Sequence, residues 1–160
     1  MFTLENYQPK HLAKMTVIWN DVLKDGVAFP GEELFSENGF EKYLAEQSIV
    51  RCMTIDDDLA GFYIVHPNNI GRCSHTANAS YCMDKAFRGK KAFPKLVQDS
   101  LKQTKEAGFK GMQFNAVVVS NEAAIHTYQE NGFDIVGTIP EGFRLKDGSY
   151  SDMYIMHKNL

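Results

Sequence analysis

The fold of this chain is indicated most clearly by one stretch, Asn121-Glu122-Ala123-Ala124-Ile125-His126-Thr127-Tyr128-Gln129-Glu130-Asn131-Gly132-Phe133. It follows Gly111 to Val119, a run of β-branched and aromatic residues that predicts a strand. Asn121 is a favoured helix N-cap residue, and Gly132 suits the end of a helix. Ala124 and Tyr128 share one helix face. The stretch therefore predicts a short helix between two strands.

A basic strand-to-helix junction lies about thirty residues upstream, at Asp84-Lys85-Ala86-Phe87-Arg88-Gly89-Lys90-Lys91-Ala92-Phe93-Pro94-Lys95. Cations crowd this junction although the whole chain carries a formal net charge of −3. A helix N-terminus presents unpaired N–H groups and the positive end of the helix dipole, so it suits a phosphate. Pro94 fits the first helical turn, where its missing N–H costs nothing. The alternative for such a junction is a solvated, lysine-rich turn.

The remaining segments alternate between strand-like and helical patterns. We expect strands at 2–7, 49–55, 59–65, 76–83, 111–119, 133–138 and 150–157, and helices at 12–24, 40–47, 94–107 and 121–131. This order predicts an α/β (α+β) fold in which a mixed, mostly antiparallel sheet of about six to seven strands is flanked by about four helices. No repeat, low-complexity tract or linker interrupts it, so residues 1–160 are expected to form one domain.

Composition argues against several classes of function. Apolar residues make up 44% of the chain and charged residues 23%, an ordinary globular mixture. The acidic balance gives no reason to expect nucleic acid or an anionic membrane as a partner. No signal peptide is visible, and no apolar run approaches the ~20 residues needed to span a bilayer. We therefore expect a soluble, cytoplasmic protein.

The cysteines suggest neither a disulfide framework nor a metal site. Cys52, Cys73 and Cys82 lie in apolar, strand-like surroundings, which predicts buried free thiols. Cys73 and His75 have no second ligand pair at zinc spacing, so we predict no structural metal.

Taken together, the two segments resemble the GNAT acetyltransferase superfamily. The pattern Asn121-x-x-Ala124-x-x-x-Tyr128-x-x-x-Gly132-Phe133 is close to motif B of that family, and Arg88-Gly89-Lys90 opens its motif A, the pyrophosphate loop. The resemblance covers Thr76 to the C-terminus, and the N-terminal half by element order only. It implies a GNAT-like sheet that is splayed between the strand ending near Met83 and the strand Gly111–Val119.

The resemblance also implies roles for individual residues, with acetyl-CoA as co-substrate. Backbone groups near Tyr81, Cys82 and Met83 would pair with the pantetheine arm like an added strand. The pyrophosphate would be held by the loop residues Arg88, Gly89, Lys90, Lys91, Ala92 and Phe93. Asn121 would hydrogen-bond the co-substrate, and Tyr128 would protonate the departing thiolate as a general acid.

Two features depart from the family pattern. Lys91 and Phe93 occupy positions where the family uses small residues, so the Phe93 ring must point away from the phosphate or fill its site. Many members carry a glutamate base on the strand before the loop, but here that strand contains Asn78-Ala79-Ser80-Tyr81-Cys82. A water relay, His75 or the loop residues Glu32 and Glu33 remain candidates for the base, although each side chain is more simply explained as a surface residue. Trp19 and Phe29 could wall an acceptor pocket, but core packing is the simpler role.

We therefore expect an acetyl-CoA-dependent N-acetyltransferase that moves an acetyl group to the amine of a small molecule by direct attack. The alternative is a catalytically impaired GNAT-fold module that binds a ligand or regulates a partner. A homodimer is compatible with the family, and the sequence assigns no apolar stripe to its interface.

Overall fold

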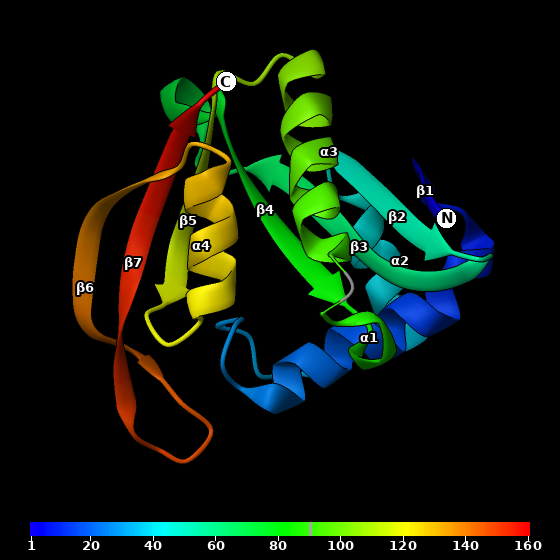
Figure 1. Cartoon of the computed structure of the whole chain (residues 1–160), viewed down its shortest axis with the longest axis horizontal. Coiled ribbons are helices and arrows are strands. Elements are labelled where there is room, and N and C mark those ends of the chain that lie inside the picture. Colours follow the sequence, from blue (N-terminus) through cyan, green and yellow to red (C-terminus); the bar gives the residue numbers. More distant parts are fainter. Residues whose placement is uncertain (90) are drawn as a thin grey trace.

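The computed structural model describes residues 1–89 and 91–160, and one seven-stranded sheet organises them. The elements, in chain order, are β1 (Phe2–Asn6), α1 (Leu12–Asp25), α2 (Glu37–Ala45), β2 (Ile49–Ile55), β3 (Asp58–Pro67), β4 (Thr76–Met83), α3 (Ala92–Glu106), β5 (Gly111–Val118), α4 (Glu122–Glu130), β6 (Asp134–Arg144) and β7 (Tyr150–Asn159), with short 3₁₀ turns η1 (Pro9–His11), η2 (Gly71–Cys73) and η3 (Lys85–Phe87). The strand order is β1-β2-β3-β4-β5-β7-β6, as Figure 1 shows. Every neighbouring pair is antiparallel except β4 and β5, which are parallel. The predicted mixed, mostly antiparallel sheet with helices around it is confirmed.

The helices divide between the two faces of the sheet, and each face has its own hydrophobic core. Leu96 of α3 and Tyr128 of α4 belong to one buried cluster, whereas Trp19 of α1 and Phe40 of α2 belong to the other. Because side chains alternate along a strand, β4 contributes to both cores. Its residue Tyr81 faces α3 and α4, and the next residue, Cys82, lies in the core beneath α1 and α2.

Three of the differences from the sequence-based expectations bear on the description of the fold. Helix α2 begins at Glu37 rather than near Phe40, because the Ser36 hydroxyl accepts a hydrogen bond from the Gly39 N–H at 3.1 Å and caps the helix earlier. Strand β6 continues to Arg144, well past the expected end at position 138, because it pairs with β7 again after a register shift. Cys73 is exposed in η2, so the prediction of a buried thiol was wrong there.

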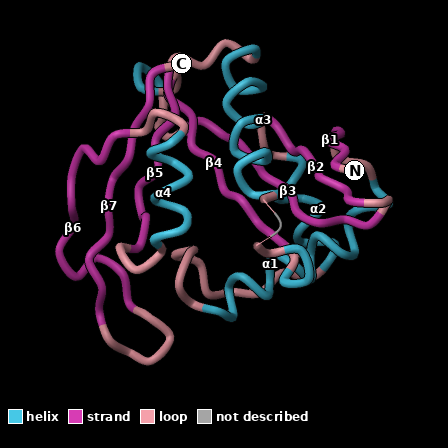
Figure 2. The backbone as a smooth tube through the Cα atoms, viewed as in Figure 1, coloured by secondary structure: helices cyan, strands magenta, loops and turns pink. Residues whose placement is uncertain are grey.

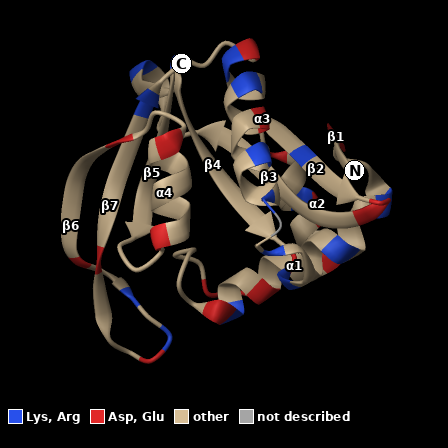
Figure 3. Ribbon diagram, viewed as in Figure 1, with Lys and Arg blue, Asp and Glu red and all other residues tan. Residues whose placement is uncertain are grey.

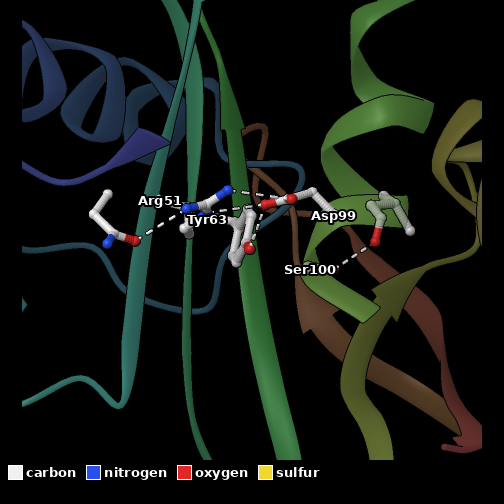
Figure 4. Close-up of polar contacts among 6 residues, drawn as sticks. Arg51, Tyr63, Asp99 and Ser100 are labelled. Carbon is white, nitrogen blue, oxygen red and sulfur yellow. Dashed lines mark hydrogen bonds and ion pairs between the residues drawn. The ribbon is translucent and has the colours of Figure 1, made fainter. Parts of the chain in front are cut away.

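Two adjacent side chains of α3 fasten that helix to the sheet. Asp99 accepts hydrogen bonds from Arg51 Nε at 3.1 Å and from the Tyr63 hydroxyl at 2.8 Å, as Figure 4 shows. Ser100 Oγ lies 2.7 Å from the Tyr81 hydroxyl on β4. Because these bonds are largely shielded from water, they hold the whole helix, including its N-terminus, in a fixed position over β3 and β4.

Residues 26–36 form the loop between α1 and α2, which Figure 2 shows as non-regular backbone.

No helix in the described part of the chain combines the length and the apolar character that crossing a membrane requires.

Candidate active site

The sheet opens between β4 and β5. The two strands pair in register only at Thr76 with Gly111 and at Ala77 with Met112, although β4 stays paired with β3 as far as Met83. Asn78 follows the last paired residue of β4, and its side-chain amide donates to the Gln113 carbonyl across the opening at 2.9 Å. Beyond this point the edge of β4 that faces β5 has no strand partner in the described chain. The splay predicted between these strands is therefore present.

A cavity of about 930 Å³ occupies this opening. Its wall combines residues from both faces of the sheet with the loop after α1 and the turn before α3. A volume of this size is at the upper end of the range typical of sites for small molecules and cofactors. Because the cavity lies between two strands, its lining includes residues from the α3–α4 face, such as Tyr128, and from the α1–α2 face, such as Val22.

One end of the cavity is formed by the turn that leads into α3. Gly89 has φ +77° and open space around the position of a Cβ, and Lys91 takes the left-handed conformation at φ +59°. Lys91 is the N-cap residue of α3 and makes no side-chain capping bond. Ala92 and Phe93 are the first two residues of α3, so their N–H groups have no partner within the helix. The end of the cavity is thus a helix N-terminus, to which a phosphate group is well suited.

The cations of this turn are partly balanced by an acidic residue. Asp25, the last residue of α1, lies 3.4 Å from Arg88 and 3.6 Å from Lys85, and Asp25, Arg88 and Lys91 all line the cavity. An anionic ligand at this end of the cavity would therefore share Arg88 with Asp25. Further Lys and Arg residues lie along α3, as Figure 3 shows.

Phe93 does not occupy the turn, because its ring is directed toward the aromatic core. The ring lies 5.8 Å from that of Tyr81 and 6.1 Å from that of Tyr128, in edge-to-face arrangements. Only its backbone is needed at the helix N-terminus. The sequence left two orientations open for this ring. In the structure the ring points away from the predicted phosphate site and does not fill it.

Tyr128 lies on α4 and lines the cavity. It packs against Phe114 of β5, with ring centroids 4.4 Å apart, and against Tyr81 of β4 at 6.1 Å. Burial, with a smaller contribution from Tyr81, raises the pKa of Tyr128 well above its ordinary value. A tyrosine hydroxyl is protonated at neutral pH even at its ordinary pKa, so the Tyr128 O–H can donate to a group bound in the cavity.

Tyr81 is held in place by hydrogen bonding as well as by packing. Its hydroxyl is bonded to Ser100, and burial raises its pKa well above the usual range. Its ring touches those of Phe93, Phe114 and Tyr128. Tyr81 thus fixes the position of Tyr128 relative to β4.

Asn121 starts α4 and borders the same cavity. Its Oδ1 accepts the Ala124 N–H at 3.4 Å, which is the predicted N-cap interaction. The Asn121 side-chain NH₂ group is not needed for capping, so it is available to donate to a ligand.

Most of the site residues expected from the sequence meet at this cavity. Those lining it are Tyr81, Met83, Arg88, Gly89, Lys91, Ala92, Phe93, Asn121 and Tyr128. Cys82 does not line it, because its side chain is buried under α1 and α2, where burial raises the pKa of the thiol. The contact expected at Lys90 falls outside the described residues.

The candidates for a base named from the sequence lie elsewhere. Glu32 is exposed and pairs with Arg144 at 2.6 Å, Glu33 is exposed, and so is His75. Phe29 lines the cavity, whereas Trp19 is a core residue among other aromatic rings. No group of three or more His, Cys, Asp or Glu side chains in the described chain is arranged to hold a metal ion.

Sequence reasoning missed a group of polar residues that also line the cavity. It consists of His66, Asn68, Asn78, Ser80 and Asn115. These residues come from strands and loops on both sides of the opening, and no local motif links them. Only the pairing register of β3 with β4, which sets His66 beside Asn78, could have indicated the group.

Comparison with known proteins gives a consistent result. The model of the acetyltransferase (GNAT) family matches residues 12–133. The N-acetyltransferase aca1 of Schizosaccharomyces pombe is 25% identical over 90% of this chain and 78% of its own length. The L-amino acid N-acetyltransferase AaaT of Escherichia coli is 26% identical over 81% of this chain and 78% of its own length.

A solved structure shares the whole fold. The phosphinothricin acetyltransferase of Sinorhizobium meliloti, determined in complex with acetyl-CoA, superposes with a TM-score of 0.92 and 18% identity, covering 99% of this chain and 88% of that one.

Proposed function

Because this chain belongs to the acetyltransferase (GNAT) family, we propose that it transfers the acetyl group of acetyl-CoA to the amine of a small molecule by direct attack. One observation carries the proposal: the unpaired N-terminus of α3 and the protonated side chain of Tyr128 border the same cavity in the split sheet. An extended molecule with a phosphate at one end and a thioester further along fits that arrangement.

The donor would lie along the free edge of β4. The N–H groups of Ala92 and Phe93 would bind pyrophosphate oxygens, and Arg88 and Lys91 would add charge. The pantetheine amides would pair with β4 near Tyr81 and Met83 as an additional strand does. The thioester would then reach the part of the cavity where Tyr128 stands.

The transfer itself requires a proton donor and an oxyanion site. As the amine nitrogen bonds to the carbonyl carbon, the C–S bond breaks and its electron pair stays on sulfur. Tyr128 supplies the proton that the departing thiolate needs, which contributes about 10²- to 10⁴-fold to rate in typical enzymes. An N–H group on the free edge of β4 would stabilise the negative oxygen.

The acceptor would enter from the α1–α2 face. The end of α1 and the loop after it give the cavity an apolar lining, and polar side chains line the cavity as well; the apolar residues are Val22, Val27, Ala28, Phe29 and Pro30. Such a pocket suits a small amine that carries an apolar group. The amino acid named in the Escherichia coli relative supports amino acids as the first acceptors to test.

The test is a turnover assay with acetyl-CoA and a panel of L-amino acids, their amides and simple alkyl amines. Released CoA is followed with a thiol reagent, and the acetylated product by mass spectrometry. We expect amine-dependent release that Tyr128→Phe lowers about 10²-fold or more in kcat, with acetyl-CoA affinity retained. Tyr150→Phe removes the hydroxyl of an exposed tyrosine and should leave turnover unchanged. Equal rates for the two variants would remove Tyr128 from the mechanism.

A further inference from the structure

His66 stands at the acceptor side of the cavity. It is half-buried on β3, lines the cavity, and lies directly opposite Asn78 in the β3–β4 register. Directly opposed residues of antiparallel strands project from the same face of the sheet. His66 and Asn78 therefore share one face, beside the point where β4 and β5 separate.

The hydrogen bond that His66 makes determines which ring nitrogen is free. Its Nδ1 lies 2.8 Å from the carbonyl oxygen of Pro67. A carbonyl oxygen can only accept, so Nδ1 must carry the hydrogen. In the neutral ring the lone pair then lies on Nε2, and that nitrogen is ready to take a proton.

Other titratable groups on the described cavity wall are not suited to this task. Asp25 is engaged with Lys85 and Arg88 beside the phosphate end. Tyr81 and Tyr128 keep their protons because burial raises the pKa of each. Arg88 and the remaining lining cation, Lys91, are donors.

His66 and Tyr128 lie on opposite faces of the sheet. Tyr128 belongs to the core under α3 and α4. Asn78 and Ser80 alternate with Ala77, Ala79 and Tyr81 along β4 and so project from the other face, as His66 does. A base on the side where the amine arrives and an acid on the side where the thiolate leaves would flank the reacting carbonyl.

From this arrangement we propose that His66 is the base that activates the acceptor amine, an assignment that rests on the proposed acetyl transfer. The amine enters as an ammonium ion, and His66 Nε2 takes one of its protons, which leaves the nitrogen lone pair free to bond to the acetyl carbon. The C–S bond breaks, and sulfur receives the Tyr128 proton. A second proton from nitrogen returns to Tyr128, and the proton on His66 passes to solvent. The products are the amide, CoA and one released proton.

The test compares His66→Gln with His75→Gln, which changes an exposed histidine outside the cavity. Both variants are assayed with the amino acid that the panel turns over best and with hydroxylamine, which is largely unprotonated at neutral pH. We expect His66→Gln to lower kcat/KM for the amino acid by about 100-fold, and to lower it far less for hydroxylamine. Acetyl-CoA affinity and melting temperature should stay at the wild-type values.

A second variant separates proton transfer from a structural role. His66→Ala should regain amino-acid turnover when imidazole is added, because a free imidazole can take the proton in the vacated space. An equal loss with both acceptors, or no rescue by imidazole, would overturn the assignment, as would His66→Gln rates within twofold of those of His75→Gln. A wild-type protein that acetylates no amine at all would instead contradict the proposed function, and the assignment with it.

Discussion

Replacing Asp99 by Asn tests how α3 is held to the sheet. The carboxylate accepts from Arg51 Nε at 3.1 Å, from Arg51 Nη2 at 3.3 Å and from the Tyr63 hydroxyl at 2.8 Å. Only 11% of the Asp99 side chain and 14% of the Arg51 side chain are exposed. Asparagine keeps the shape but removes the charge, and its NH₂ group must face one of these donors. The guanidinium is then left largely buried without its counter-ion.

The expected loss follows from these contacts. Hydrogen bonds to charged groups contribute about 1.5–3 kcal/mol each, and breaking a buried ion pair costs about 3–5 kcal/mol. Since Arg51 keeps some access to water and a bond to Asn6 at 3.0 Å, we expect Asp99→Asn to lower the free energy of unfolding by about 2–4 kcal/mol. For a chain of this size that corresponds to a fall in melting temperature of about 4–16 °C.

Urea denaturation at neutral pH measures this loss, with Glu32→Gln as the control. Glu32 and Arg144 form an ion pair of the same chemistry, but their side chains are 77% and 56% exposed. Such a pair contributes about 0–1 kcal/mol. If Asp99→Asn and Glu32→Gln differ by less than about 0.5 kcal/mol, the attachment of α3 through Asp99 does not stabilise the fold as argued.

Three further predictions concern how side chains pack within the fold. In thermal unfolding, Gly61→Ala should destabilise the protein by about 1–3 kcal/mol, because a Cβ there would lie 2.6 Å from the Cys82 carbonyl oxygen. The control Gly137→Ala should be near neutral in the same experiment, because a Cβ at Gly137 meets no atom within 4 Å. Ser100→Ala should cost about 1–3 kcal/mol, measured by urea denaturation, since the buried Tyr81 hydroxyl loses its partner. A thiol reagent at pH 8 should titrate one cysteine in the native protein and three after unfolding, because one thiol is exposed and two are buried. Rapid reaction of all three would show that the core beneath α1 and α2, which holds Cys52 and Cys82, is open.

Local patterns predicted the elements of the fold well. The spacing of apolar residues indicated α1 and α4, and strand composition indicated β4 and β5 almost to the residue. Helix starts were less accurate where a single side chain decides them, as Ser36 does for α2. The strand expected at 133–138 is shorter than β6. The last part of β6 depends on pairing with β7, which the local sequence does not show.

The site was predictable only where it depends on a local motif. The turn before α3 and the position of Tyr128 on α4 follow from neighbouring residues, so the sequence indicated both. The direction of the Phe93 ring depends on packing against Tyr81 and Tyr128, which come from distant segments. The place of His66 depends on strand register, and a single histidine at the end of an apolar strand gives no local signal.

The proposed transfer requires that the cavity between β4 and β5 bind acetyl-CoA through the N-terminus of α3. A thermal-shift titration of the wild-type protein with acetyl-CoA, beside CoA and desulfo-CoA, tests it directly. At one hundred times the dissociation constant, binding should stabilise the native state by about 2.7 kcal/mol, a rise in melting temperature of about 5–10 °C. A saturable rise of this size is the predicted result. No rise with millimolar acetyl-CoA would show that the N-terminus of α3 does not bind the donor, and it would contradict the proposed transfer.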